Sequence, residues 1–204
     1  MKKMMFNDRY GLTDAVIEGR KTMTRRLIPD EFFGLTWDTR GNTLVYENEY
    51  GDFIDVRLSK YTRYKVGEIV AVAQNYFSTY DESKWENGIW YNEFADGSDI
   101  TNHAGWLNKM LVKAEYMPHQ IRITGIHCER LQDISDAECL KEGVRVEFAR
   151  NGGPMYYYFD TKRWREVWFD TPREAFAALI DKVSGRGTWA SNPWVVVCEF
   201  ELVK

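Results

Sequence analysis

The pattern of apolar and polar residues predicts a chain of many short strands and three short helices. Near the start, Leu12, Val16 and Ile17 recur at a helical spacing. They predict a helix over residues 10–18, and Gly19 is the expected stop because glycine readily adopts the left-handed conformation that ends helices. A basic segment follows directly after this helix.

In the next part of the chain, apolar and polar residues mostly alternate, as in β-strands. Residues 22–28 are rich in β-branched and apolar side chains and predict a strand that ends before Pro29. Residues 35–58 read as hairpins, with turns at 40–42 and 50–52. A core strand is expected over residues 66–76.

The middle of the chain contains a segment of different composition. Residues 78–117 are acidic and rich in Trp and Tyr, and Asn87-Gly88 is a turn signal. We interpret this segment as an inserted hairpin and loop region. Residues 120–130 alternate again and predict a strand.

Two capping boxes mark helix starts in the second half. One spans residues 135–138 and predicts a short helix to Glu142; the other spans residues 171–174 and begins the clearest helix, which stops at Gly185. The apolar face of that helix is formed by Phe176, Leu179, Ile180 and Val183.

Strand-like runs flank these helices. Residues 144–159 form two such runs around a turn at 151–154, and residues 193–203 predict the last strand. No repeat or linker divides the chain, so we expect one domain over residues 1–204. The elements together predict an α+β domain built on a small β-barrel, with short flanking helices.

The amino-acid composition bears on the size of the core and on the location of the protein. The chain has 204 residues, of which 44% are hydrophobic, and its net charge is −4. This is enough apolar material for one core. We expect a cytoplasmic protein without a membrane span, because no long apolar run occurs.

Cysteine and histidine spacing gives no sign of a metal site. The three cysteines, Cys128, Cys139 and Cys198, lie far apart, so neither a disulfide framework nor a zinc site is indicated. His103, His119 and His127 also lack metal-ligand spacing, and we interpret them as structural. No cofactor and no metal are predicted.

Positive charge is concentrated in residues 19–26. This segment holds four cationic side chains and no acid, within an acidic protein. It also places the amine of Lys21 three residues before the hydroxyl of Thr24. Such a segment can hold an anion or activate a nucleophile.

Four blocks of sequence carry a resemblance to a known family. They are Glu18-Gly19-Arg20-Lys21-Thr22-Met23-Thr24-Arg25-Arg26, Tyr64-Lys65-Val66-Gly67-Glu68-Ile69-Val70, residues 129–143 and residues 187–195. In this order the chain resembles the ASCH superfamily of PUA-like β-barrel proteins, in particular its phage and bacterial branch. Some members are amidohydrolases that remove the acetyl group from N4-acetylcytidine, and others are known or suspected to bind RNA.

The resemblance implies a catalytic set. The family's Lys-x-x-Thr motif falls on Lys21 and Thr24, and its glutamate falls on Glu142, with Glu138 as the second choice. The sequence departs from the family pattern at one place. Residues 73–76 read Ala-Gln-Asn-Tyr, where the phage branch commonly has Arg-Glu-(Thr/Ser)-(Trp/Tyr). A different ligand or activity is one consequence to expect.

The implied chemistry makes two physical demands. Lys21 can act as a base only when neutral, which requires lowering its pKa from about 10.4 to about 7. Burial and neighbouring arginines act in that direction, whereas Glu142 opposes it. In addition, residues three apart point to opposite faces of a strand, so the chain must bend near Thr22.

Further residues are expected to contact the ligand. Arginine forks suit phosphate or carboxylate, and aromatic rings can stack on a base. The predicted ligand contacts are Arg20, Arg25, Arg26, Tyr76 and Trp194. The ligand is expected to be a modified nucleoside or RNA. Two other hypotheses stay open: a non-catalytic RNA-binding module, and an accessory protein that binds only another protein.

Overall fold

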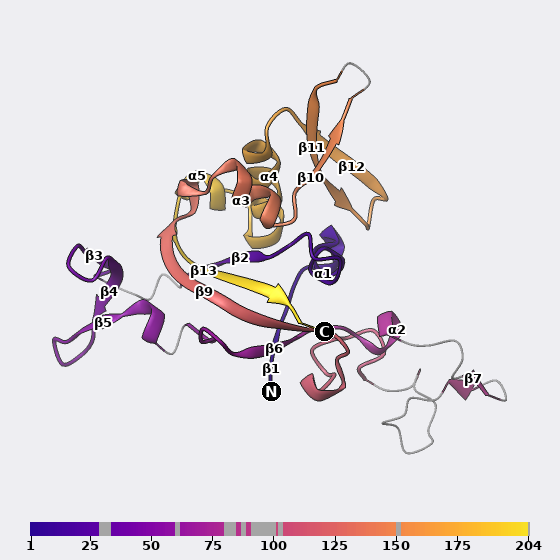
Figure 1. The fold of residues 1–204 in the computed structure, drawn as a ribbon, viewed down its shortest axis with the longest axis horizontal. Coiled ribbons are helices and arrows are strands. Elements are labelled where there is room, and N and C mark those ends of the chain that lie inside the picture. The colour runs from indigo at the N-terminus through magenta and orange to yellow at the C-terminus, as the bar shows by residue number, and fades with distance from the viewer. Residues whose placement is uncertain are drawn as a thin grey trace.

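The computed structural model describes residues 1–28, 34–59, 62–79, 85–86, 89–90, 101, 104–149 and 152–203. It confirms the predicted α+β class, because sheets make up most of the regular structure and the helices are few and mostly short. Figure 1 shows a central sheet with smaller sheets to either side.

The central sheet has five strands in the order β1-β6-β9-β13-β2. Their bounds are β1 Lys2–Met4, β2 Met23–Leu27, β6 Ile69–Val72, β9 Gln120–Arg130 and β13 Trp194–Leu202. Only β1 and β6 are parallel; the other neighbours are antiparallel. The long strands β9 and β13 form the middle of the sheet and position β2 at one end.

Smaller sheets flank this centre. They consist of β3 Thr36–Asp38, β4 Thr43–Glu47 and β5 Phe53–Asp55; of β7 Trp85–Glu86 and β8 Ile89–Trp90; and of β10 Arg145–Phe148, β11 Pro154–Asp160 and β12 Arg165–Phe169. Each pairs antiparallel throughout.

The helices are mostly short. They are α1 Leu12–Ile17, α2 Tyr76–Thr79, α3 Asp136–Lys141, α4 Pro172–Ser184 and α5 Thr188–Ser191, with 3-10 turns η1 Asp8–Tyr10, η2 Val56–Leu58, η5 Ala114–Tyr116 and η6 Leu131–Asp133. Helices α3, α4 and α5 lie together between the central sheet and the β10–β12 sheet (Figure 1). Helix α4 also packs against β11 and β12.

The predicted barrel is not formed by strand pairing among the described residues, since β1 and β2 end the central sheet without pairing to each other. A side chain nevertheless links the two ends: Nη2 of Arg26, on β2, donates to the backbone oxygen of Met5, just after β1, at 2.5 Å. The Arg26 guanidinium also lies over the ring of Phe6. The sheet therefore curves enough to bring its ends near each other.

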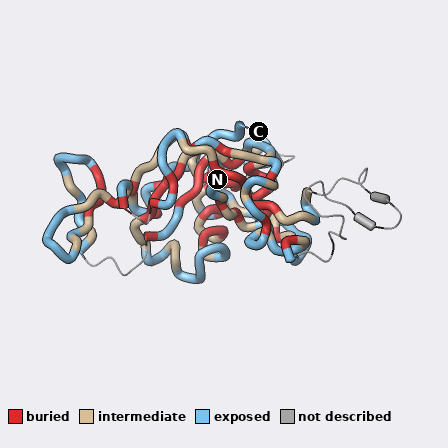
Figure 2. The backbone as a smooth tube through the Cα atoms, turned by 90° about the horizontal axis from the view of Figure 1, so that it is seen from below, coloured by how far each residue is buried: buried red, intermediate tan, exposed pale blue. Residues whose placement is uncertain are grey.

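The core lies between the sheet and the helices. Fully buried side chains include Phe176 of α4, Ile121 and Ile123 of β9, and Val195 of β13. Figure 2 shows the buried residues gathered in the middle of the molecule, whereas the outlying loops are exposed. This core fixes the positions of β2, α3 and α4.

Most predicted elements are confirmed, including both capping boxes, at Ser135 and Thr171. The strand expected over residues 66–76 is shorter, because β6 ends at Val72 and Tyr76 already begins α2. Strand β12 and helix α5 were not predicted. In the predicted insertion, β7 pairs with β8. Other parts of this segment lie outside the described residues, namely 80–84, 87–88, 91–100 and 102–103. The same holds for Pro29 and part of the turn at 151–154.

Candidate functional site

The basic segment leaves helix α1 through an irregular turn. Gly19 has a φ of 73°, a left-handed conformation that favours glycine. The backbone N–H of Lys21 then donates to Ala15, and that of Thr22 donates to the carbonyl of Lys141 at 3.0 Å. The turn is thereby tied to the end of α3, and β2 begins only at Met23. The chain is therefore irregular around Thr22, where the sequence required a bend.

Lys21 is buried, and its ammonium group donates to three oxygen atoms. The residue is only 2% exposed. Its Nζ donates to the backbone oxygens of Met23 and Glu142, both at 2.7 Å, and to Oε2 of Glu142 at 2.5 Å. Three acceptors match the three protons of an ammonium group. This arrangement favours a buried Lys21–Glu142 ion pair as the resting state.

Two effects act on the Lys21 amine in opposite directions. Burial lowers the pKa of Lys21, because the charged form loses its hydration. The carboxylate of Glu142 raises this pKa, while Arg25 and Arg26 lower it. Burial is the largest of these effects, and we conclude that the pKa of Lys21 lies below its ordinary value. The proposed chemistry needs a lowered pKa of Lys21, and the pKa is shifted in that direction.

Arg25 organises the carboxylates around this pair. Its side chain is completely buried and contacts Glu142 Oε1 at 3.1 Å, Glu129 Oε1 at 2.7 Å and Glu138 Oε2 at 3.3 Å. Glu142 is thus held between Lys21 on one carboxylate oxygen and Arg25 on the other. Because leaving a buried charge unpaired is costly, each member of this network depends on the opposite charge of its partners.

The two candidate glutamates have different surroundings in the structure. Glu142 caps the end of α3 and touches Lys21. Glu138 instead accepts from the backbone and hydroxyl of Ser135, which completes the capping box. The geometry therefore favours Glu142 as the site carboxylate.

A cavity of about 310 Å³ opens beside this network. It is lined by Lys21, Thr24, Arg25 and Glu142, by Arg26 and Leu27, by residues 5–7 and Leu12, and by the α4 side chains Phe176, Leu179, Ile180, Val183 and Ser184. Polar groups thus meet an apolar wall, as is common in small-molecule sites. The three residues that the resemblance marked as catalytic all line this one cavity.

The cavity follows the edge of β2 that faces away from β13. Thr22 accepts a hydrogen bond from Phe200, and Ile28 donates one to Trp194. In an antiparallel ladder such residues alternate with residues whose backbone groups point outward. The N–H and C=O of Arg25 therefore point toward the cavity side.

Thr24 reaches this cavity from the strand. It is 6% exposed and pairs in register with Cys198 of β13. Lys21 reaches the same cavity from the turn before the strand, so the two side chains are not restricted to opposite faces of one regular strand. The irregular backbone at 20–22 explains how residues three apart can line one space.

All three predicted ligand arginines lie elsewhere or are already engaged. Arg20 forms an ion pair with Glu18 at 2.5 Å and lines a different cavity. Arg26 lines the candidate cavity, although its Nη2 already bonds to Met5. Arg25, as described, faces carboxylates.

The two predicted aromatic contacts lie outside the cavity lining. Tyr76 packs against the small cluster of Ala71, Ala73, Val112 and Met117. The Trp194 ring stacks on Trp37 with centroids 5.6 Å apart, and the Arg130 guanidinium lies 4.3 Å from its centroid. Trp194 thus takes part in a separate aromatic stack.

The sequence departure at residues 73–76 has a structural counterpart. Gln74 is buried, and its Oε1 lies 2.7 Å from Nδ1 of His119. A neutral pair occupies this position, remote from the cavity lining. His119 is thus held by a polar contact in the structure, and His103 lies outside the described residues.

Titratable sulfur plays no visible part in the site. Cys128, Cys139 and Cys198 are free and buried, and burial raises the thiol pKa to about 12 for Cys128 and Cys139 and to about 11 for Cys198. Within the described ranges, no group of three or more His, Cys, Asp and Glu side chains could hold a metal ion.

Sequence reasoning missed two parts of the site. Glu129, which binds Arg25, sits in a strand and carries no motif that links it to the basic segment. The apolar wall from α4 was recognised only as a core face. Its amphipathic pattern does not reveal which residues border a cavity rather than the core.

No protein-family model, curated protein or solved structure matches this chain. In the described part of the chain, no helix has the length and apolar character needed to cross a bilayer.

Proposed function

We propose that this protein is a cytoplasmic PUA-like domain of the ASCH type that hydrolyses an N-acyl amide of a modified nucleoside such as N4-acetylcytidine. The observation that carries the proposal is that Lys21, Thr24 and Glu142 line one cavity, with Lys21 and Glu142 in direct contact. The curvature that brings Arg26 to Met5 also supports a barrel-like arrangement.

The reaction begins with Thr24 as nucleophile. The Lys21 ammonium first passes a proton to Glu142, across the 2.5 Å contact. Neutral Lys21 then takes the hydroxyl proton while Oγ1 of Thr24 attacks the acyl carbon. The backbone N–H of Arg25, on the cavity side of β2, is suited to stabilise the oxyanion.

Protonated Glu142 completes the first half of the reaction. Its proton goes to the leaving nitrogen as the C–N bond breaks, which leaves the acyl group on Thr24 and releases the amine. Water then attacks the ester and gives one proton to the Lys21–Glu142 pair, which returns it to Oγ1 of Thr24 as the ester C–O bond breaks and the carboxylic acid leaves. The Lys21–Glu142 ion pair is restored at the end of this cycle.

The cavity suits a small ligand. At about 310 Å³ it lies near the lower limit of small-molecule sites, which begin at about 300 Å³. The wall formed by α4 suits the flat face of a base, and the outward backbone groups of Arg25 suit its polar edge. This favours hydrolysis over the alternative of a non-catalytic RNA-binding module in which Arg25 grips phosphate, because that guanidinium already meets three carboxylates.

The test is to incubate the purified protein with N4-acetylcytidine and to follow cytidine release. Thr24→Val removes only the hydroxyl at nearly constant volume, so we expect a folded protein without turnover, whereas Thr24→Ser should retain activity. Lys21→Met should lower the rate by about 10²- to 10⁴-fold. Thr36→Val serves as a control, because Thr36 is exposed and remote.

Two results would contradict the proposal. One is turnover by the Thr24→Val variant at the normal rate. The other is the absence of cytidine release by the folded wild-type protein, which would favour the non-catalytic alternative if the protein then binds RNA.

A further inference from the structure

The β10–β12 sheet has one face in the core and one face covered by aromatic rings. Tyr158 and Phe169 belong to the face that packs into the core. Tyr157 of β11 pairs in register with Trp168 of β12, and Phe159 follows two residues further along β11. Because side chains alternate along a strand, these three rings share the opposite, outer face.

The rings on this outer face contact one another and extend to the hairpin tip. Tyr157 and Trp168 have centroids 4.3 Å apart, and Phe159 meets Trp164 at 5.5 Å in an edge-on contact. Trp168 is 40% exposed and Trp164 is 81% exposed. The row thus presents two indole rings to solvent from a supported sheet.

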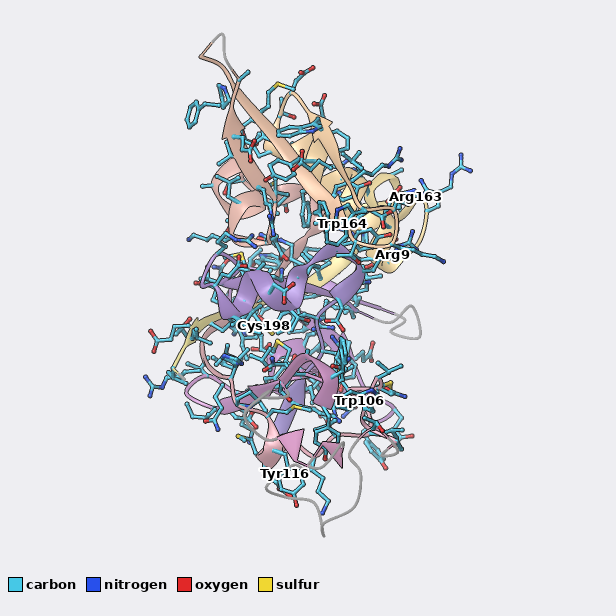
Figure 3. All side chains as sticks on the ribbon, turned by 90° about the vertical axis from the view of Figure 1, so that its right-hand side faces the viewer. Arg9, Trp106, Tyr116, Arg163, Trp164 and Cys198 are labelled. Carbon is cyan, nitrogen blue, oxygen red and sulfur yellow. The ribbon has the colours of Figure 1, made fainter. Side chains whose placement is uncertain are left out.

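Trp164 occupies an unusual backbone position. It ends the loop 161–164, which joins β11 to β12, and its φ is 49°. A bulky residue rarely adopts this left-handed conformation, which costs free energy that burial of an 81% exposed ring does not repay. The loop itself is anchored, since Thr161 donates to the carbonyl of Arg9, and Arg9 pairs with Asp160. Figure 3 shows Arg9, Arg163 and Trp164 at the same end of the molecule.

Cations flank this exposed ring in the sequence. Lys162, Arg163 and Arg165 are neighbours of Trp164 in sequence and are all exposed. One acid, Asp160, lies near Arg163 at 4.0 Å, but it is already engaged by Arg9 at 3.3 Å. Glu166 is the other acid in this stretch. Three cations in four residues form a local excess of positive charge in a protein of net charge −4.

A second group of cations lies at the other end of the aromatic row. A cavity of about 420 Å³ is lined by Arg20, Lys141 and Arg145, together with Tyr157 and the apolar residues Leu140, Val144 and Val146. No acid lines it. Arg20 and Lys141 directly precede Lys21 and Glu142 in sequence, so this cavity borders the same turn and helix end as the candidate site.

We propose that this face, from Trp164 to the cavity of Lys141 and Arg145, binds single-stranded RNA; Arg20 lines the same cavity but already pairs with Glu18 and is not one of the phosphate contacts. Bases stack on the exposed rings, and the cations at both ends of the row hold phosphates. A single strand is required because duplex bases already stack on one another. The choice of RNA over DNA rests on the proposed function, in which the substrate is a modified nucleoside. The observations on the exposed rings and the cations do not depend on that function.

The experiment measures binding of a fluorescently labelled single-stranded RNA by anisotropy. Trp164→Gly removes the ring and suits the positive φ, so the hairpin should remain folded. We expect this variant to bind about 10- to 100-fold more weakly. Tyr50→Gly is the matched control, because Tyr50 is also 81% exposed but lies on another sheet; it should bind normally.

The salt dependence tests the phosphate contacts. Arg163→Gln should reduce the slope of log affinity against log salt by about 0.7, the value for one contact to a single strand. Arg40→Gln, an exposed arginine on the β3–β4 turn, should leave the slope unchanged. Normal affinity in Trp164→Gly, or an unchanged slope after replacing Lys162, Arg163 and Arg165 together, would overturn the proposal.

This result is independent of the proposed hydrolysis. Thr24→Val should bind RNA as the wild type does, and Trp164→Gly should still hydrolyse the free nucleoside. A protein that loses RNA binding in Trp164→Gly but never releases cytidine would contradict the proposed function alone. A protein that releases cytidine but does not bind RNA would contradict this inference alone.

Discussion

Two groups of cations in this acidic chain have opposite environments. Lys21 and Arg25 are buried, and together they contact the carboxylates of Glu129, Glu138 and Glu142. The cations around Trp164 are exposed on a hairpin tip, where Asp160 is the one acid recorded within 4.0 Å of them. The first group is therefore neutralised inside the protein, whereas the second presents its charge to solvent.

The difference separates two kinds of function that look alike in sequence. Lys21, held by a buried carboxylate, has a fixed position and a lowered pKa, both of which suit proton transfer. A cation on an exposed turn keeps its hydration and can exchange it for phosphate. We therefore propose proton transfer for the buried group and nucleic-acid contact for the exposed one.

The largest expected effect is loss of the buried carboxylate. Glu142→Gln leaves the Lys21 ammonium and part of Arg25 without their counter-charge, and we expect the free energy of unfolding to fall by about 3 kcal/mol. Urea denaturation measures this. Glu201→Gln is the control, since Glu201 pairs with Arg122 at the surface and should contribute little. Equal stability of the two variants would show that the buried pair is not essential to the fold.

A smaller effect is expected at the exposed group. At a positive φ, glycine is favoured over alanine, so Trp164→Gly should be more stable than Trp164→Ala by about 0.5 to 1 kcal/mol. At Tyr50, which has no positive φ, the same pair of substitutions should give the opposite order. Thermal or urea unfolding of the four variants compares them directly. The same order at both positions would argue against a strained Trp164.

The buried group was partly predictable from sequence. The resemblance to a known family implied Lys21, Thr24 and Glu142, because its Lys-x-x-Thr motif and its short helix are local patterns of the sequence. The need for a bend near Thr22 followed from strand geometry alone. The partners of Arg25 were not predictable, because Glu129 reaches it only through the register of β9, β13 and β2.

The exposed group was not predicted at all. The sequence Lys162-Arg163-Trp164-Arg165 reads as an ordinary polar turn, and strand β12 after it was missed because its alternation is short. The aromatic row depends on which face of β11 packs against α4, which only the tertiary structure decides. The barrel, in turn, was predicted from the many short strands and from the resemblance, and the pairing of the described strands does not close it.

The smallest effect concerns the solvent-facing end of the buried network. Nε2 of His127 lies 3.4 Å from Glu129, which binds Arg25, and Nδ1 lies 3.6 Å from Glu199. Its contact with Glu129 raises the pKa of His127 above 6.5, against the opposing effect of burial. The stability from this contact is therefore present below pH 6.5 and is lost as pH rises through the folded-state pKa. His127→Gln should remove this dependence, with a change below about 1 kcal/mol because the ring is partly exposed.

His119 provides the control of opposite sign. Burial lowers the pKa of His119 below 6.5, so its neutral form is favoured in the folded protein. Between the folded-state pKa and pH 6.5 the unfolded chain binds more protons, and stability rises with pH. The unfolding free energies of His127→Gln, His119→Gln and the wild type are measured from below to above pH 6.5. The pH dependence of the two variants should depart from that of the wild type in opposite directions. If both differ in the same direction, Glu129 does not hold the His127 proton, and the buried network ends at Glu129.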